Sequence, residues 1–161
     1  MDLVYDVAHN IAKIEEHEVG GKRRKVLVHR KGATRSFGPR YDKIPADYQA
    51  TEQPVLIPGI MESSSWVMVG TYKAMEISFG STAHGAGRVM SRSAAKRKFW
   101  GGDVREKLKG QGIIVRSASQ EALAVEAPGA YKDVDRVAEV NDKLGIATRV
   151  ARLVPLAVVK G

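Results

Sequence analysis

The segment DVDRVAEVNDKLG, residues 133–145, decides the fold class of this chain. Asp133 is typical of the residue that caps a helix N-terminus, and Gly145 is typical of the residue that follows a helix. Apolar residues recur between them at a spacing of three or four: Val134, Val137, Val140 and Leu144. This spacing predicts a helix with one apolar face. Residues 149–160 follow as a β-rich segment interrupted by Pro155. A helix beside short strands predicts an α+β fold.

Short elements separated by glycine and proline account for the rest of the chain. We expect strands over residues 25–29, 55–57, 66–69 and 113–115. We expect further helices over residues 3–16, 91–99 and 103–108. The first of these follows from Val7, Ile11 and Ile14, which lie at helical spacing, and Gly20-Gly21 would end it. Gly101-Gly102 would separate the other two helices, and residues 31–54 read as irregular. The prediction is one unit, residues 1–161, of mixed short strands and a few helices.

The composition is that of a globular protein. Of 161 residues, 43% are hydrophobic and 27% are charged. No apolar run approaches the roughly 18 residues that cross a membrane, so no membrane partner is expected. The N-terminus also lacks the basic region of a secretory signal. Cysteine is absent, which excludes disulfides and cysteine-ligated metals in this chain. We expect a cytoplasmic protein.

The charge balance favours an anionic partner. Lys and Arg number 26 against 18 Asp and Glu, a net charge of +8. Such a charge suits RNA, DNA or a nucleotide, although solubility alone would also explain it. Aromatic residues make up 6%, which argues against a platform for stacking single-stranded bases.

A glycine-rich stretch of small residues precedes a basic region, and both could carry chemistry. In His84-Gly85-Ala86-Gly87-Arg88, small residues let backbone N–H groups approach an anion. His84 could act as a metal ligand, an acid or base, or a nucleophile toward phosphorus; a tight turn with an incidental histidine is the alternative. Arg88, Arg92 and Lys96 would share one helical face able to follow a phosphate backbone, unless that face is merely solvated.

His9 is a candidate metal ligand that lacks companions in the sequence. A transition-metal site needs three or four ligands, and the nearest histidine, His17, is eight residues away. An exposed or hydrogen-bonded histidine is the alternative interpretation.

Five stretches of the chain resemble the RtcB family of RNA-splicing ligases, in the family's order. They are YDVAHN (5–10), HRKGATR (29–35), HGAGRVMSR (84–92), EAPGAYKDV (126–134) and RLVPL (152–156). The resemblance implies the C-terminal portion of the RtcB-type fold, about a third of a usual member. It places the other manganese ligands, an aspartate, a cysteine and two histidines, in the portion that this chain does not contain.

The resemblance also implies a reaction. RtcB ligases join RNA ends that carry a 2′,3′-cyclic phosphate or 3′-phosphate to 5′-hydroxyl ends, in tRNA splicing and RNA repair. They use GTP and Mn(II), and a histidine forms a covalent histidine–GMP intermediate. Implied partners are RNA and the remaining ligase portion, in cis or in trans. A second copy of the chain could also cover its exposed surfaces. The alternative function is a non-catalytic nucleotide- or RNA-binding module derived from the ligase.

Residue by residue, His84 matches the guanylylated histidine, and His9 matches a manganese ligand. Lys31, Arg88 and Arg92 match basic residues placed for RNA or phosphate. Positions that match nucleotide-binding segments are His9, Asn10, Pro58, Gly59, Ile60, Met61, Ser65, His84, Gly85, Ala86, Gly87, Tyr131 and Lys160. Among these, Tyr131 matches an aromatic packed on guanine and Lys160 matches the lysine at the guanine edge.

Two positions depart from the family pattern. Ile60 stands where a serine is usual, which removes a hydroxyl that could bind phosphate. Glu62 stands where a glycine is usual and adds a negative charge close to the expected triphosphate. Both changes, together with the missing ligands, favour the non-catalytic alternative.

Overall fold

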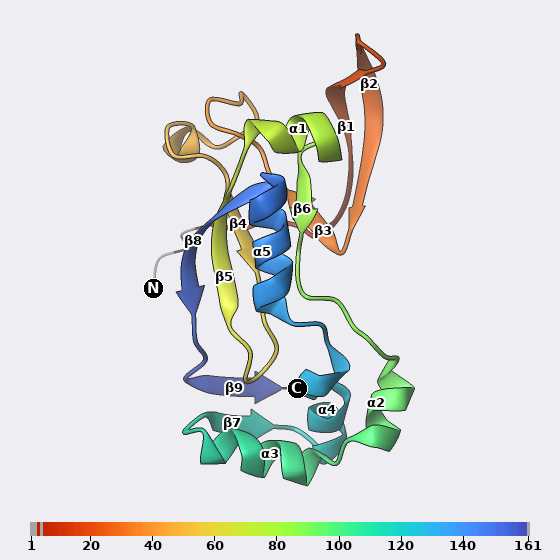
Figure 1. Ribbon diagram of the computed structural model, residues 1–161, viewed down its shortest axis with the longest axis vertical. Coiled ribbons are helices and arrows are strands. Elements are labelled where there is room, and N and C mark those ends of the chain that lie inside the picture. Colours follow the sequence, from red (N-terminus) through yellow and green to blue (C-terminus); the bar gives the residue numbers. More distant parts are fainter. Residues whose placement is uncertain (1–2, 4, 161) are drawn as a thin grey trace.

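The computed structural model describes residue 3 and residues 5–160, and it confirms an α+β fold (Figure 1). The helices are α1 (Tyr72–Ser78), α2 (Arg92–Lys98), α3 (Gly101–Gly110), α4 (Gln120–Val125) and α5 (Val134–Leu144), with 3-10 turns at Ala46–Tyr48 and Pro128–Ala130. The strands are β1 (Asn10–Val19), β2 (Lys22–Lys31), β3 (Ala33–Arg35), β4 (Pro54–Ile57), β5 (Ser65–Gly70), β6 (Ser81–Ala83), β7 (Ile114–Ser117), β8 (Ala147–Leu153) and β9 (Ala157–Lys160). No helix of this described part is long and apolar enough to cross a bilayer.

The strands form small separate sheets. Strands β1 and β2 form a long antiparallel hairpin, and β3 pairs antiparallel with β6. Strands β4, β5 and β8 form an antiparallel sheet with β5 in the centre. Strands β7 and β9 pair in parallel. Strand β6 ends at Ala83, so its pairing with β3 fixes the backbone that leads directly into His84.

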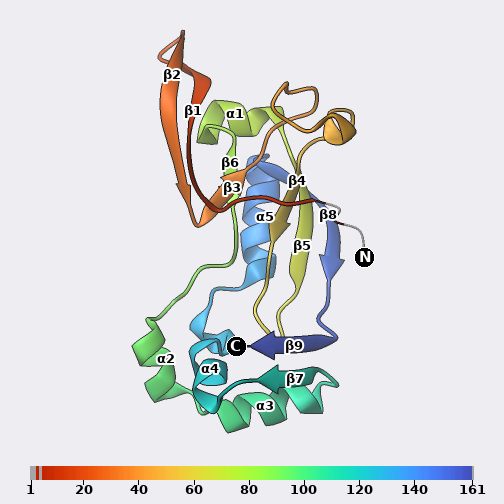
Figure 2. The same ribbon diagram turned by 180° about the vertical axis from the view of Figure 1, so that it is seen from behind.

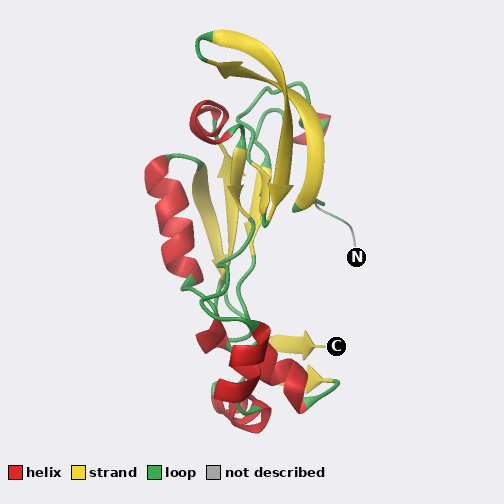
Figure 3. Ribbon diagram, turned by 90° about the vertical axis from the view of Figure 1, so that its right-hand side faces the viewer, coloured by secondary structure: helices red, strands yellow, loops and turns green. Residues whose placement is uncertain are grey.

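Two apolar cores hold the molecule. In the first, helix α5 covers one face of the β4–β5–β8 sheet (Figure 3). Val134 and Ala138 of α5 pack there against Ile57 and Met68 of the sheet. Ala86, from the loop after His84, belongs to the same core. The loop is therefore anchored in the body of the protein.

The second core lies among α3, α4, β7 and β9 (Figure 2). Leu108 and Leu123, which are almost fully buried, form its centre together with Val158 of β9. Met61 also packs there, although its loop connects two strands of the first region. Residues 58–65 thus lie where the two regions meet.

The helix expected over residues 3–16 is wrong. Strand β1 begins at Asn10 and forms a hairpin with β2 around Gly20 and Gly21, which both have positive φ. The helical spacing of Val7, Ile11 and Ile14 does not mark a buried face, because Ile14 is 70% exposed whereas Glu15 and His17 are buried. Burial in β1 alternates as in a strand, but the buried residues are charged or polar.

Most other expected elements are confirmed, with shifted ends. Helix α5 follows its Asp133 cap, and β8 and β9 occupy the β-rich segment on either side of Pro155. Gly101-Gly102 does not break a helix but begins α3, and Asp103 lies in its first turn. Helices α1 and α4 and strand β6 were not expected, and strand β3 lies within residues 31–54, which were predicted to be irregular. Both helices carry a sequence signal, a side-chain N-cap at Thr71 and Ser119.

The buried face of α5 also differs from its apolar stripe. Val140 and Leu144 are about half exposed, whereas Asn141 is buried. Asn141 Oδ1 accepts a hydrogen bond from Thr82 Oγ1 at 2.9 Å, and its Nδ2 donates to the Val137 carbonyl. The amide lies inside because β6 supplies a partner for it.

Candidate functional site

His9 and His84 lie face to face. Their ring centroids are 3.7 Å apart and the ring planes differ by 4°. The two residues are 75 positions apart in the sequence, yet the fold places them in direct contact. The two histidines for which the resemblance implies chemistry therefore belong to one site.

The backbone of Gly32 holds both histidines. Its N–H donates to the His9 carbonyl at 2.9 Å, and its carbonyl accepts from the His84 N–H at 3.4 Å. Gly32 has a φ of +70°, in the left-handed region that favours glycine. This one turn between β2 and β3 joins the start of β1 to the end of β6.

The surroundings of His84 keep its side chain neutral near pH 7. Burial lowers the pKa of His84 below its ordinary value of 6.5, and repulsion from His9 lowers it further. A neutral imidazole has a free lone pair on one nitrogen. Such a ring can act as a nucleophile or bind a metal.

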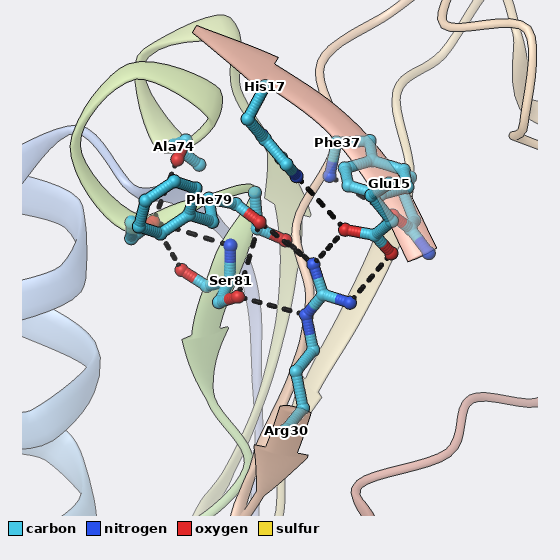
Figure 4. Close-up of polar contacts among 10 residues, drawn as sticks. Glu15, His17, Arg30, Phe37, Ala74, Phe79 and Ser81 are labelled. Atoms are coloured by element: carbon cyan, nitrogen blue, oxygen red, sulfur yellow. Dashed lines mark hydrogen bonds and ion pairs between the residues drawn. The ribbon is translucent and has the colours of Figure 1, made fainter. Parts of the chain in front are cut away.

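A buried ion pair fixes the hairpin to the chain that leads to His84 (Figure 4). Arg30 and Glu15 are 1% and 3% exposed, and two Arg30 nitrogens donate to the two Glu15 oxygens at 2.8 Å. Arg30 also donates to Ser81 Oγ and to the carbonyls of Phe79 and Gly80. The hairpin is thereby attached to the residues that begin β6, three positions before His84.

Residues 58–65 form a tight loop beside the His84 loop. The Gly59 N–H donates to Ser65 Oγ at 3.0 Å, and the Ile60 N–H donates to Ser63 Oγ. A Cβ on Gly59 would lie 1.9 Å from the Ser64 carbonyl oxygen, so only glycine fits there. Gly85 lies against the Pro58 carbonyl. The structure thus brings together two of the segments predicted to bind the nucleotide.

Asp135, on the first turn of α5, holds this loop from behind. Its carboxylate accepts hydrogen bonds from Ser64, from Trp66 Nε1 at 2.7 Å and from Arg152. The hydrogen bond from Arg152 is the main reason that the pKa of Asp135 lies well below its ordinary range, and Ser64 and Trp66 lower it further. Sequence reasoning missed this residue, because Ser64 and Trp66 lie about 70 positions away and Arg152 lies 17 away.

A cavity of about 570 Å³ opens next to both loops. Ile60, Ala86 and Tyr131 are among its lining residues, with Glu62 and Lys107. Lys107 Nζ lies 2.8 Å from Glu62 Oε1. The negative charge that Glu62 adds to this region is therefore accompanied by a positive one.

Glu126 connects three residues that the resemblance places in or near the nucleotide site. The Tyr131 hydroxyl donates to Glu126 Oε2 at 2.6 Å, and Lys160 Nζ lies 3.9 Å from the same oxygen. Arg88 Nη1 lies 3.7 Å from the other oxygen and donates to the Tyr131 hydroxyl. Burial, followed by the influence of Glu126, raises the pKa of Tyr131 above its ordinary value of 10. Sequence reasoning gave Glu126 no role, although it begins the EAPGAYKDV stretch.

The predicted basic face of Arg88, Arg92 and Lys96 is wrong. Helix α2 begins at Arg92, so Arg88 lies outside it. Arg88 is held by hydrogen bonds to the carbonyls of Met90 and Val125 and to Tyr131. Arg92 and Lys31 are exposed, and Lys96 pairs with Glu121. Arg88 therefore has a structural part that Arg92 does not share.

The described residues do not form a complete metal site. Residue 3 and residues 5–160 contain no group of three or more His, Asp or Glu side chains arranged to hold a metal ion. His9 and its neighbour Asn10 are both exposed at the start of β1. A metal bound at His9 would need additional ligands, so the residues present do not by themselves fit Mn(II).

The chain is similar to known proteins over its whole length. The family model of the tRNA-splicing ligase RtcB matches residues 1–161. The chain is 59% identical over 161 residues to the tRNA-splicing ligase RtcB of Archaeoglobus fulgidus, and 57% identical to that of Pyrococcus horikoshii. All of this chain is covered in both comparisons, but only 33% and 18% of those proteins. The similarity extends over every segment of the candidate site, and the chain belongs to the RtcB family of tRNA-splicing ligases.

Proposed function

We propose that this chain is the nucleotide-binding and guanylyl-accepting part of a GTP-dependent RNA ligase. The stacked pair of His9 and His84 is the observation that carries the proposal. The pair places a neutral imidazole at the start of the His84 loop. Ala86, two residues further along this loop, lines a cavity of about 570 Å³. The whole ligase would join 2′,3′-cyclic phosphate or 3′-phosphate RNA ends to 5′-hydroxyl ends.

His84 is the proposed nucleophile. Its free imidazole nitrogen attacks the α-phosphorus of GTP, a nitrogen–phosphorus bond forms, and pyrophosphate leaves with the electron pair of the broken P–O bond. The guanylyl group then passes to the RNA 3′-phosphate, and the 5′-hydroxyl displaces GMP. Packing against His9 limits the orientations of the His84 ring before the attack, which is the entropic part of such catalysis.

The nucleotide base is assigned to the side of the cavity where Tyr131 lies. Tyr131 offers an aromatic face, and Glu126 holds it close to Lys160. A Cβ at Gly85 would meet only the Pro58 carbonyl oxygen, at 3.7 Å, and one at Gly87 would meet nothing within 4 Å, so the backbone of the His84 loop is open to a phosphate, whereas the Gly59 N–H is already bonded to Ser65 Oγ. The contact between Glu62 and Lys107 supports the catalytic function over the non-catalytic alternative, because it offsets the charge that would repel a triphosphate.

Mn(II) would supply charge neutralisation on the phosphates when bound. His9 is the proposed ligand from this chain, and the resemblance assigns the remaining ligands to sequence outside it. We therefore expect the isolated 161-residue chain to form no histidine–GMP and to seal no RNA. If pure chain, free of contaminating ligase, gave ligated product with GTP and Mn(II), this assignment of the metal ligands would be wrong.

The decisive experiment labels the adduct. The chain, joined to the rest of a ligase polypeptide, is incubated with Mn(II) and GTP labelled at the α-phosphate, and the labelled peptide is mapped. We expect label on His84, full loss in His84→Ala and normal labelling in His29→Ala, whose histidine is exposed on β2. Label on a lysine, or label that persists in His84→Ala, would overturn the proposal. No label in any variant would favour the non-catalytic module.

A further inference from the structure

A second cavity lies on the far side of α3 and has no part in the site above. Its volume is about 440 Å³, and its lining residues are Arg105, Glu106, Lys109, Gly112, Ile113, Ile114, Val115 and Arg116. None of these lines the cavity of Ala86 and Tyr131, which contacts α3 through Lys107. The two cavities therefore lie on different faces of one helix.

Three cations gather around this second cavity. Arg105 and Lys109 are four residues apart on α3, so their side chains share a face of the helix, and Arg116 comes from β7. Glu106 is the single acidic residue of the lining. The cavity thus carries a formal charge of +2, from side chains on two different elements.

These cations lack partners within the described part of the chain. Arg105, Lys109 and Arg116 make no side-chain hydrogen bond or ion pair with residue 3 or residues 5–160, and Glu106 pairs with none of them. The Nε–H of Arg105 is buried without an acceptor. A buried donor without a partner is costly, and nearly all such donors in folded proteins are satisfied. No described carboxylate neutralises the three cations, so their positive charge remains available to an anionic ligand.

Phosphate oxygens suit this arrangement better than a single carboxylate. A guanidinium donates to a phosphate through two parallel hydrogen bonds, and a lysine adds a point charge. Three cations on two elements can contact successive phosphates, because a nucleic-acid backbone presents negative charges at regular intervals. The exposed side chain of Ile114 adds an apolar wall on which a sugar or base can lie.

We propose that the cavity of Arg105, Lys109 and Arg116 binds the phosphate backbone of the RNA substrate, away from the joining site. The proposal rests on the RNA ligase function proposed above and adds a second place of contact for the RNA. It assigns no base recognition to the cavity, because phosphate contacts position a nucleic acid without reading its sequence.

The test compares two variants that lose the same charge. In the first, Arg105, Lys109 and Arg116 are all replaced by Gln. In the matched control, Lys22, Arg24 and Lys25 of the hairpin, which are exposed, are replaced by Gln. Binding of a labelled single-stranded RNA to the full chain is measured at several salt concentrations. The melting temperature of each variant is checked first, and the exposed single variant Arg116→Gln serves if the triple variant does not fold.

We expect the cavity variant to bind RNA about tenfold more weakly, and its salt slope to fall by about 2, as loss of three contacts to a single strand predicts. The hairpin variant should lose less than about threefold. Equal losses in both variants, or unchanged affinity in the cavity variant, would overturn the proposal. The proposal would also be overturned if the cavity variant lost binding to an acidic polypeptide but still bound RNA normally.

Labelling of His84 separates this proposal from the proposed function. In the complete ligase, the cavity variant should form the GMP adduct at the normal rate, because the cavity lies apart from His84. If RNA binding depends on the cavity, this proposal is supported even when no adduct forms on His84. If RNA affinity is unchanged in the cavity variant, this proposal fails even when His84 does form the adduct.

Discussion

Glu15 and Glu126 occupy similar arrangements in two regions of the molecule, and they differ in burial. Each carboxylate faces an arginine and at least one further titratable group: Arg30 and His17 for Glu15, and Arg88, Lys160 and Tyr131 for Glu126. The Glu15 side chain is 3% exposed, and the Glu126 side chain is 20% exposed. Around Glu15, Arg30 donates its other hydrogen bonds to the carbonyls of residues 79 and 80 and to Ser81 Oγ. Around Glu126, the Lys160 ammonium lies at 3.9 Å and retains donors for a ligand.

This difference separates a scaffold from a binding surface. A buried ion pair contributes rigidity, because breaking it leaves a charge without water. A partly exposed cluster can exchange one partner for a ligand at lower cost. The same residue types therefore hold the hairpin in the first region and, in the second, leave donors available for the nucleotide of the proposed function.

Breaking the buried pair should give the largest loss of stability. Arg30→Met leaves the Glu15 carboxylate buried without its main partner, and we expect a loss of about 3–5 kcal/mol in the free energy of unfolding. Denaturant unfolding followed by circular dichroism measures it. In wild type, burial raises the pKa of Glu15, but the hydrogen bonds from Arg30 and His17 outweigh burial and leave it below its ordinary value.

The control for this variant removes both charges. Glu15→Leu combined with Arg30→Met should recover most of the lost stability, because an apolar pair of similar volume leaves no buried charge. If the single and double variants are equally unstable, hydrogen bonds to the backbone rather than the ion pair hold the hairpin.

Asp135 tests a more exposed carboxylate, since its side chain is 41% exposed. Asp135→Asn should cost less than about 1.5 kcal/mol at pH 7, because solvent screens its pairing with Arg152. The pKa of Asp135 is lowered in the fold, so its stabilisation is present above the unfolded value near 4 and is lost as the pH falls toward the folded value. The difference between wild type and variant should therefore shrink between about pH 5 and pH 3 in urea unfolding series. A difference that stays constant with pH would show that the charge of Asp135 does not matter.

The smallest effect on stability is expected at Glu126. Glu126→Gln should change the free energy of unfolding by less than about 1 kcal/mol, because its contacts with Arg88 and Lys160 are long, at 3.7 and 3.9 Å, and the Gln amide oxygen can still accept from the Tyr131 hydroxyl. It should also lower the pKa of Tyr131 toward its ordinary value, since a neutral amide no longer opposes ionisation of the phenol. NMR of ring-labelled tyrosine follows that titration. A stability loss as large as that of Arg30→Met would remove the distinction between the two regions.

The sequence predicted the elements that satisfy local rules. Helix α5 has a capping aspartate, a regular apolar spacing and a terminal glycine, and β8 and β9 lie on either side of Pro155. The first strand was missed because its inward side chains, Glu15 and His17, are of types normally found outside. Their burial depends on Arg30, which comes from another strand, and no local pattern shows that pairing.

The candidate site was predictable only in part, for the same reason. His84 and the small residues after it form a recognisable sequence motif, and the resemblance to the family added His9 to the candidate site. The contact between the two rings depends on the Gly32 backbone, and the roles of Glu126 and Asp135 depend on partners brought together by folding. The prediction that Arg88, Arg92 and Lys96 share a helical face is wrong because helix α2 begins at Arg92, four residues after Arg88.

The tip of the β1–β2 hairpin offers a practical route to following this protein in action. The β1–β2 hairpin projects from the body of the molecule (Figure 1), and a Cβ at Gly20 or Gly21, which lie between its two strands, would meet no atom within 4 Å. Turns of this kind accept inserted sequence with little disturbance. A small reporter domain or a fluorophore-bearing peptide inserted between these glycines would leave Glu15, Arg30 and the histidine pair intact. The protein could then be tracked, immobilised or tethered to a chosen RNA without altering His9 or His84.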